Sequence, residues 1–301
     1  MDGRRVVVSL LTEEQEFQRM QAADARAASV RAGLEVVVLF AENNPVVQIQ
    51  QLFRFVHAAQ EERPAAIVVE SVVGEGLERV ARNAVRAGIG WVLLNWKVAY
   101  LEGLRREHPG VIVASVAADE REIGHIQARQ FRALLPNGGR ALYVQGPPDT
   151  TTAQGRRDGL LEGLQGTAIE VKVLTGDWTE TVAERAVAAW LRLKTSEGAH
   201  LALVGAQNDS MALGARRAIV AHQPEWARLP FTGCDGLPEG GQKLVAQGQL
   251  AATVVKPTTA GPAVELVARA LRGLATPPEV ILAPRSHPPE EALARRAQAR
   301  A

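Results

Sequence analysis

Short apolar runs rich in β-branched residues alternate with longer amphipathic stretches along almost the whole chain. Compact apolar runs are typical of buried strands, whereas apolar residues that recur every three or four positions indicate helices. The runs predict strands at residues 6–10, 35–40, 66–69, 91–94, 111–115, 140–144, 170–174, 201–204, 229–233 and 250–255. The stretches between them predict helices at residues 17–32, 45–60, 76–87, 120–135, 155–164, 180–193, 210–222 and 258–274.

The predicted strands are too apolar for a sheet that keeps one face in water. They therefore indicate parallel sheets that are covered on both sides. Regular alternation of strands and helices is typical of right-handed crossover units in a doubly wound architecture. We expect an α/β fold with two doubly wound parallel-sheet lobes joined by a three-strand hinge.

The length of the chain also favours two lobes, because 301 residues exceed the usual size of one hydrophobic core. The two halves follow the same outline of strands and helices, without a strict sequence repeat. We expect the chain to cross between lobes near residues 113–119, at Lys256-Pro257, and in the strand after Pro278. The expected division is an N-terminal lobe of residues 1–118 and 257–284, a C-terminal lobe of residues 119–256 and 285–301, and a ligand cleft between them.

Composition and charge exclude several classes of function. Hydrophobic residues make up 47% of the chain and charged residues 22%, which is typical of a folded globular protein. The formal net charge is +1, from 34 basic and 33 acidic residues, so no electrostatic footprint for nucleic acid or an anionic membrane is present. No apolar run is long enough to span a bilayer, and we expect neither a nucleic-acid partner nor direct membrane insertion.

The chemistry-bearing residues favour binding over catalysis. A single cysteine, Cys234, excludes an intrachain disulfide and a cysteine-based zinc cluster. The six histidines lack metal-ligand spacing, and the motifs of dinucleotide-binding folds, P-loops, serine hydrolases and zinc proteases do not occur. We therefore expect no catalytic residue, no metal and no cofactor, and an enzyme is the hypothesis that the sequence favours least.

The segment AQNDSMALGA at residues 206–215 is the most informative part of the chain. It leaves a predicted strand and enters a predicted helix, and ligands of open α/β sheets bind at such carboxyl ends. Asn208 can donate and accept hydrogen bonds, while the Asp209 carboxylate only accepts, so the pair suits hydroxyl groups. The alternative is that Asp209 caps the helix.

Six short segments at or after predicted strands follow one another in a characteristic order. They are VVS at 7–9, AENNP at 41–45, VQGPP at 144–148, AQNDSMALGA at 206–215, TGCDG at 232–236 and LAAT at 250–253. In this order they resemble the type I periplasmic sugar-binding proteins, and most closely the ribose-binding branch. The resemblance covers about residues 4–284 and implies the type I periplasmic binding protein fold. That fold is shared with the effector domains of lactose-repressor-type regulators.

The resemblance implies a ligand-binding role for four residues of the second lobe. It makes Asn208 and Asp235 the main polar contacts, and Arg156 a planar donor to ring or hydroxyl oxygens. Trp178 matches an aromatic residue that can stack on the C–H face of a sugar. Alternatives are a capped Asp-Gly turn at Asp235 and a solvated helix arginine at Arg156.

In the first lobe the resemblance implies a ring-stacking role for Phe17, with Gln15 beside it. Phe17 could equally be the first core residue of its helix. Gln15 lies in a loop that is about two residues longer than in the family.

The chain departs from the ribose-binding pattern after three strands. Glu70 replaces an asparagine, Asn95 and Trp96 replace an aspartate–arginine pair, and Lys256 replaces a glutamine. Because a buried, unpaired charge is costly, we expect Glu70 and Lys256 either to bind each other across the cleft or to contact the ligand. These changes leave a pyranose, a polyol such as an inositol, and an acidic or amino sugar open as ligands.

The leading hypothesis is a non-catalytic solute receptor that closes about its hinge on a small sugar, polyol or sugar derivative. By resemblance its partner is an ABC permease or a membrane sensor. The alternative is a cytoplasmic sugar-sensing effector protein of the same fold without a DNA-binding domain, for which there is no room before Val6. A removed leader would place the protein in the periplasm, and a native start at Met1 would place it in the cytoplasm.

Overall fold

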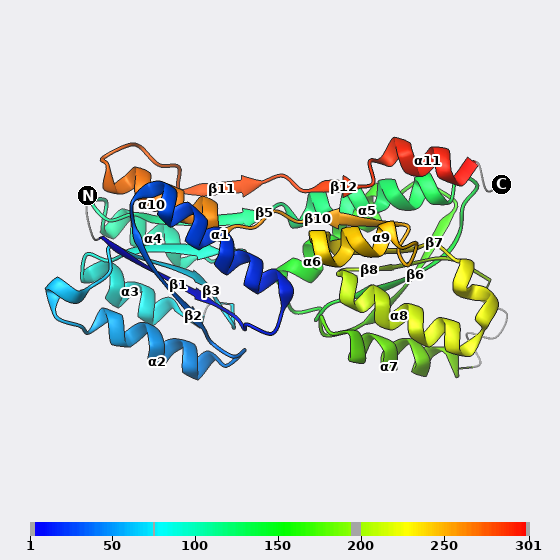
Figure 1. Ribbon diagram of the computed structural model, residues 1–301, viewed down its shortest axis with the longest axis horizontal. Coiled ribbons are helices and arrows are strands. Elements are labelled where there is room, and N and C mark those ends of the chain that lie inside the picture. Colours follow the sequence, from blue (N-terminus) through cyan, green and yellow to red (C-terminus); the bar gives the residue numbers. More distant parts are fainter. Residues whose placement is uncertain (1–3, 75, 194–199, 299–301) are drawn as a thin grey trace. The chain divides into compact units, whose positions relative to one another are not determined.

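The computed structural model describes residues 4–74, 76–193 and 200–298 (Figure 1). These residues form two compact units. Unit 1 comprises Met1–Ala118 and Thr258–Leu282, and unit 2 comprises Asp119–Pro257 and Ala283–Ala301. The chain therefore passes from one unit to the other three times.

Unit 1 contains a parallel sheet with the strand order β11-β5-β4-β3-β1-β2. The order reverses at β1, which pairs with both β2 and β3, as expected for a doubly wound sheet. Its strands are β1 (Arg5–Leu10), β2 (Glu35–Phe40), β3 (Ala66–Glu70), β4 (Gly90–Leu94), β5 (Val113–Ala118) and β11 (Glu279–Leu282).

Helices cover both faces of this sheet (Figure 1). Alternate strand residues point to opposite faces, so Val6 and Val8 enter the core beneath α1 and α10, while Val7 enters the core beneath the other helices. The helices are α1 (Glu16–Ala32), α2 (Pro45–Val56), α3 (Glu78–Arg86), α4 (Tyr100–Glu107) and α10 (Ala260–Leu271), with a 3₁₀ turn η1 at Gln60–Glu62.

Unit 2 has a second sheet with the order β12-β10-β9-β8-β6-β7. All its pairs are parallel, as expected, except β10–β12, which is antiparallel. The chain re-enters unit 2 there and runs back along β10 without a crossover helix. The strands are β6 (Gly139–Gln145), β7 (Ile169–Thr175), β8 (Leu201–Ala206), β9 (Phe231–Asp235), β10 (Ala252–Val255) and β12 (Arg285–His287).

Two helical layers also cover the sheet of unit 2. Glycines allow α5 and α6 to approach closely, since a side chain at Gly159 would collide with the backbone of Arg121. The helices are α5 (Glu120–Leu134), α6 (Thr151–Gly163), α7 (Glu180–Leu191), α8 (Asp209–His222), α9 (Lys243–Ala246) and α11 (Glu290–Gln298), with a 3₁₀ turn η3 at Pro224–Arg228 and a π turn η4 at Pro238–Gln242.

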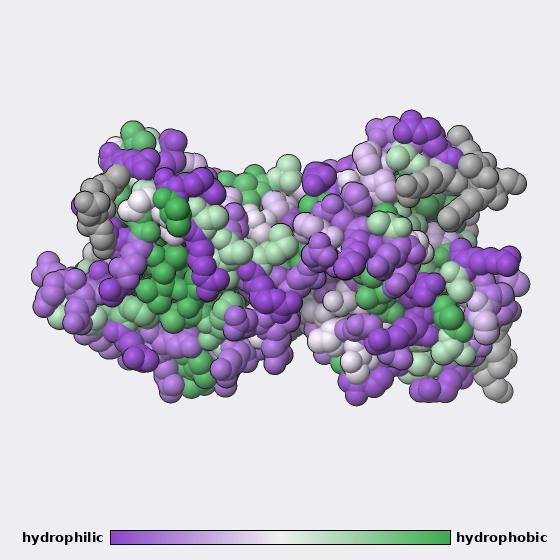
Figure 2. Space-filling view, viewed as in Figure 1, coloured by the Kyte–Doolittle hydropathy of each residue, from purple (hydrophilic) through white to green (hydrophobic). Residues whose placement is uncertain are grey.

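The pattern of the sequence predicted most of these elements. It missed the helices α4, α9 and α11 and the three-residue strand β12. Helix α2 ends four residues before its predicted end, because the chain turns at His57. Hydrophilic residues cover much of the visible face of each unit, and hydrophobic residues form patches among them (Figure 2).

Candidate functional site

The carboxyl ends of the parallel strands carry the most unusual backbone of the molecule. Among the described non-glycine residues, five have a positive φ, and all follow or end a strand. Such conformations cost free energy and cluster at functional sites. The five are Glu42 and Asn43 after β2, Asn95 after β4, Trp178 after β7 and Asp235 at the end of β9.

The turn that carries Asp235 is braced from beneath by Asp209. The Asp209 carboxylate accepts hydrogen bonds from the amide of Gly236 at 2.8 Å and from the hydroxyl of Thr253 at 2.7 Å. Asp209 is buried, and Gly241 leaves room for it because a side chain there would collide with its carboxylate. Asp235 therefore projects from a rigid support at the end of β9.

Asn208 has a structural role besides its predicted binding role. Its Oδ1 accepts a hydrogen bond from the amide of Met211 at 2.8 Å and caps α8, while its Nδ2 donates to the carbonyl of Trp178 at 2.9 Å. The interpretation of Asp209 as the helix cap was wrong. The Asn208 amide retains one hydrogen and one lone pair for a ligand.

Trp178 lies over Gly146, the residue after β6. A Cβ atom at Gly146 would collide with the indole, so the glycine is required by the ring. The guanidinium carbon of Arg156 lies 5.7 Å from the centroid of the Trp178 ring, within cation–π range. The half-buried indole is thus held in one orientation.

Arg156 is buried and belongs to a chain of three charged side chains. Its Nε atom donates to Oε2 of Glu120 at 2.6 Å, and its Nη1 atom donates to the carbonyl of Gln207. The second oxygen of Glu120 lies 3.1 Å from Nζ of Lys256. Arg156 is 2% exposed, so the alternative of a solvated helix arginine was wrong.

This arrangement keeps the charges of the cluster in place. Burial acts to raise the pKa of Glu120, but Arg156 and Lys256 outweigh burial and hold that pKa below its ordinary value. Burial acts to lower the pKa of Arg156, but Glu120 and Asp235 contribute to a net shift above its ordinary value. Glu120 and Arg156 are therefore ionised at neutral pH.

Glu70, at the end of β3, organises the strand-end edge of unit 1. It is 6% exposed, and its two carboxylate oxygens accept from Nε2 of Gln18 at 3.0 Å and from Nδ2 of Asn95 at 2.9 Å. Its carbonyl accepts from the side chain of Gln48 at 2.8 Å. Three amide side chains thus hold Glu70.

Glu70 and Lys256 each have a partner within their own unit, so burial does not require that they bind each other or a ligand; contact of either residue with a ligand stays a prediction. Lys256 pairs with Glu120 inside unit 2, and Glu70 accepts two hydrogen bonds inside unit 1. Neutral amides solvate the Glu70 carboxylate, and Glu120, which follows the first passage between units, supplies the countercharge of Lys256.

The remaining predicted residues differ in burial. Trp96 donates its indole N–H to the carbonyl of Ser71 at 3.0 Å and lies in van der Waals contact with the position of Gly74. Phe17 is buried in the first turn of α1, whereas Gln15 is exposed just before that helix.

Comparison with known proteins identifies the family. The family described as "Periplasmic binding protein domain" matches residues 6–275. The chain belongs to this family.

Relatives within the family bind sugars. The chain is 35% identical to the D-galactose/methyl-galactoside binding periplasmic protein of Haemophilus influenzae, over 46% of this chain and 44% of that protein. It is 25% identical to the ribose import binding protein of Salmonella typhimurium, over 77% of this chain and 72% of that protein. The match thus spans less than half of the first relative. The predicted resemblance to type I periplasmic sugar-binding proteins is confirmed.

The fold is also that of the family. A solute-binding protein of an ABC transporter from Actinobacillus succinogenes, solved with bound D-allose, superposes with a TM-score of 0.81. The two chains are 18% identical, and the match covers 97% of this chain and 99% of the other. The predicted fold class, with two parallel-sheet α/β lobes, is confirmed. Members of the family are non-enzymatic solute-binding proteins.

Two buried acceptors lie at strand ends, one on the predicted residue Asn95 and one on Gln145, which was not predicted. Among the described residues, Oδ1 of Asn95 and Oε1 of Gln145 have no hydrogen-bond partner. Both residues lie at or next to the carboxyl end of a strand. The predicted site lacked three residues that lie beside strand ends. Gln145 ends β6, while Gln18 and Glu120 lie in the first turn of a helix that follows a strand. That position is the sequence signal that could have found them.

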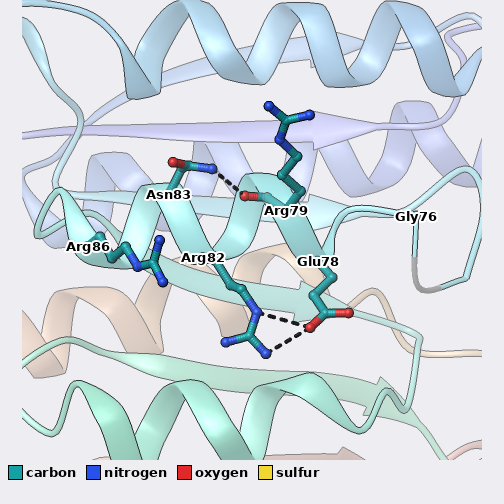
Figure 3. A pocket seen from close by; sticks show the side chains of 6 residues that line it. All are labelled: Gly76, Glu78, Arg79, Arg82, Asn83 and Arg86. Carbon is teal, nitrogen blue, oxygen red and sulfur yellow. Dashed lines mark hydrogen bonds and ion pairs between the residues drawn. The ribbon is translucent and has the colours of Figure 1, made fainter.

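A separate depression lies on the outer side of α3 (Figure 3). Its side chains bind one another along the helix, since Arg82 donates twice to Glu78 and Asn83 donates to the carbonyl of Arg79. It contains none of the predicted site residues. The strand-end residues are therefore the better candidates for a ligand.

No helix among the described residues is long and apolar enough to cross a membrane. In the same part of the chain, no group of three or more His, Cys, Asp or Glu side chains could hold a metal ion. The one cysteine, Cys234, is buried, and burial raises its pKa to about 12.

Proposed function

We propose that this chain is a non-catalytic receptor for a small polyhydroxylated solute, a sugar or polyol. The observation that carries the proposal is the set of oriented polar side chains at the strand ends, with Asp235 on its braced turn at the centre. The sugar-binding relatives of the family support the same conclusion.

In unit 2, Asp235 would accept from adjacent hydroxyl groups, and charge-assisted bonds of this kind are stronger than neutral ones. The free hydrogen and lone pair of Asn208 would serve a third hydroxyl. The indole of Trp178 would pack on the C–H face of the ligand. The held Arg156 would donate from a guanidinium that loses little freedom on binding.

Unit 1 would contribute Glu70, Asn95 and Trp96, with Phe17 and Gln15 near the start of α1. A ligand that takes contacts from both units favours the state in which all contacts form together. Movement of the units about the three chain passages would then accompany binding. We propose that an ABC permease recognises this liganded state, as the import role in the name of the ribose-binding relative suggests.

A thermal-shift screen against pentoses, hexoses, inositols, sugar acids and amino sugars tests the proposal. A ligand that binds only the folded state raises the melting temperature, by an amount that grows with its concentration. The Asp235→Asn variant should lose the shift. Glu170→Gln, which removes one negative charge at the opposite edge of the same unit, should keep it. A panel in which no compound raises the melting temperature would refute the proposal.

A further inference from the structure

The carboxylate of Glu70 is buried without a countercharge. Among the residues that the structure describes, no Lys, Arg or His nitrogen forms an ion pair with it. Its two hydrogen-bond donors, Gln18 and Asn95, are neutral amides. Amide hydrogen bonds solvate a carboxylate, but they do not neutralise its charge.

The polarity of the neighbouring amides is fixed. Oε1 of Gln18 accepts from the backbone amide of Leu11 at 3.2 Å, so this side chain must present its NH₂ group to Glu70. Asn95 also presents its NH₂ group to Glu70, because the reverse orientation would set its oxygen against the carboxylate. Its Oδ1 atom is therefore left as a buried acceptor without a partner.

Glu70 and Asn95 lie at adjacent strand ends. Glu70 pairs with Leu94 across β3 and β4, and Asn95 follows directly. The Glu70 carboxylate and Oδ1 of Asn95 thus lie at neighbouring strand ends of unit 1. Both can accept hydrogen bonds from a ligand. Asn95 is 8% exposed and has a φ of 58°, a conformation that the surrounding structure must hold.

In unit 2, by contrast, the buried cations lie beside acidic side chains. The cations Arg156 and Lys256 are matched there by the anions Glu120 and Asp235. The charge of Glu70 belongs to unit 1, where its two hydrogen-bond donors are neutral amides. A monocationic ligand would balance it.

We infer that the ligand is an amino sugar or amino polyol whose protonated amine binds Glu70 and Oδ1 of Asn95. The inference rests on the proposed function and narrows its ligand class. An ammonium group has three donors and a positive charge, so it can donate to both acceptors and neutralise Glu70. A neutral hydroxyl has one donor and leaves the charge of Glu70 unbalanced.

Matched pairs of probes test the inference. We would measure dissociation constants by calorimetry for D-glucosamine against D-glucose, D-galactosamine against D-galactose, and an amino-inositol against myo-inositol. At a pH where the amines are protonated, the amine of at least one pair should bind roughly 10-fold to 100-fold more tightly, the range expected of a charged hydrogen bond. Glu70→Gln should bring the ratio within that pair close to one.

Two further variants separate charge from folding. Glu70→Asp retains the charge and should retain the preference for the amine, even with weaker binding overall. Glu35→Gln removes a negative charge from the opposite edge of the same sheet and should leave the ratio unchanged. Circular dichroism spectra and melting temperatures of all variants report whether they fold.

The outcomes distinguish the class of ligand from the receptor function. Neutral sugars or inositols that bind as tightly as their amino counterparts would overturn the inference and leave the proposed function standing. A preference for the amine that survives Glu70→Gln would also overturn it. Absence of binding by every compound, neutral or charged, would overturn the proposed function together with the inference.

Discussion

Glu120 joins Arg156 to Lys256: its Oε2 atom accepts from Nε of Arg156 at 2.6 Å, and its Oε1 atom lies 3.1 Å from Nζ of Lys256. Glu120 follows the first passage of the chain between units, and Lys256 precedes the second. One carboxylate therefore links two passages inside unit 2 and positions a guanidinium of the candidate site.

The Glu120→Gln substitution should destabilise the protein by about 3–5 kcal/mol, because it leaves two buried cations without their shared anion. Denaturant unfolding measures this loss. Glu122→Gln on the same helix removes an exposed ion pair and should cost about 1 kcal/mol or less. Equal costs for the two variants would contradict a buried, coupled role for Glu120.

Protonation of Glu120 should lower the stability of the protein at acidic pH. The folded pKa of Glu120 lies below the ordinary value of 4.5, so protonation opposes folding. Its contribution is present above the unfolded pKa and is lost as the pH falls through the lower, folded pKa. Melting temperatures of the wild type and of Glu120→Gln, measured from neutral pH to below 4.5, should converge at the acid end.

The Asp235→Asn substitution should weaken binding of the identified sugar or polyol at least about 10-fold, since a charged hydrogen bond contributes roughly 1.5–3 kcal/mol. The braced turn does not depend on the Asp235 carboxylate, because Asp209 holds the amide of Gly236. We therefore expect a nearly unchanged melting temperature without ligand. Calorimetry that finds wild-type affinity would remove Asp235 from the site.

The Gly146→Ala substitution should displace the indole of Trp178, because a Cβ atom there collides with the ring. Overpacking of this kind costs about 1–3 kcal/mol. A shift of the tryptophan emission and weaker ligand binding should accompany the loss of stability. Gly110→Ala serves as the control, since a Cβ atom at Gly110 meets nothing within 4 Å. An unmoved emission spectrum would show that the ring tolerates the methyl group.

Much of the candidate site could be predicted because it depends on topology. Asn95, Trp178, Asn208 and Asp235 all lie at carboxyl ends of parallel strands, and strand ends can be located from apolar runs. The sequence places Glu120 and Gln18 beside strand ends, but it does not identify the residues that they bind. Each lies at the start of a helix, and its partner is 36 or 52 residues away in the sequence.

The sequence by itself determined the α/β class, the strand–helix order and the strand ends that carry polar side chains, because these follow from local periodicity and parallel topology. Only the tertiary structure decided which charges neutralise one another: Lys256 pairs with Glu120, while Glu70 rests on neutral amides. Burial and distance set the energy of a charge, and both depend on residues that lie far apart along the chain.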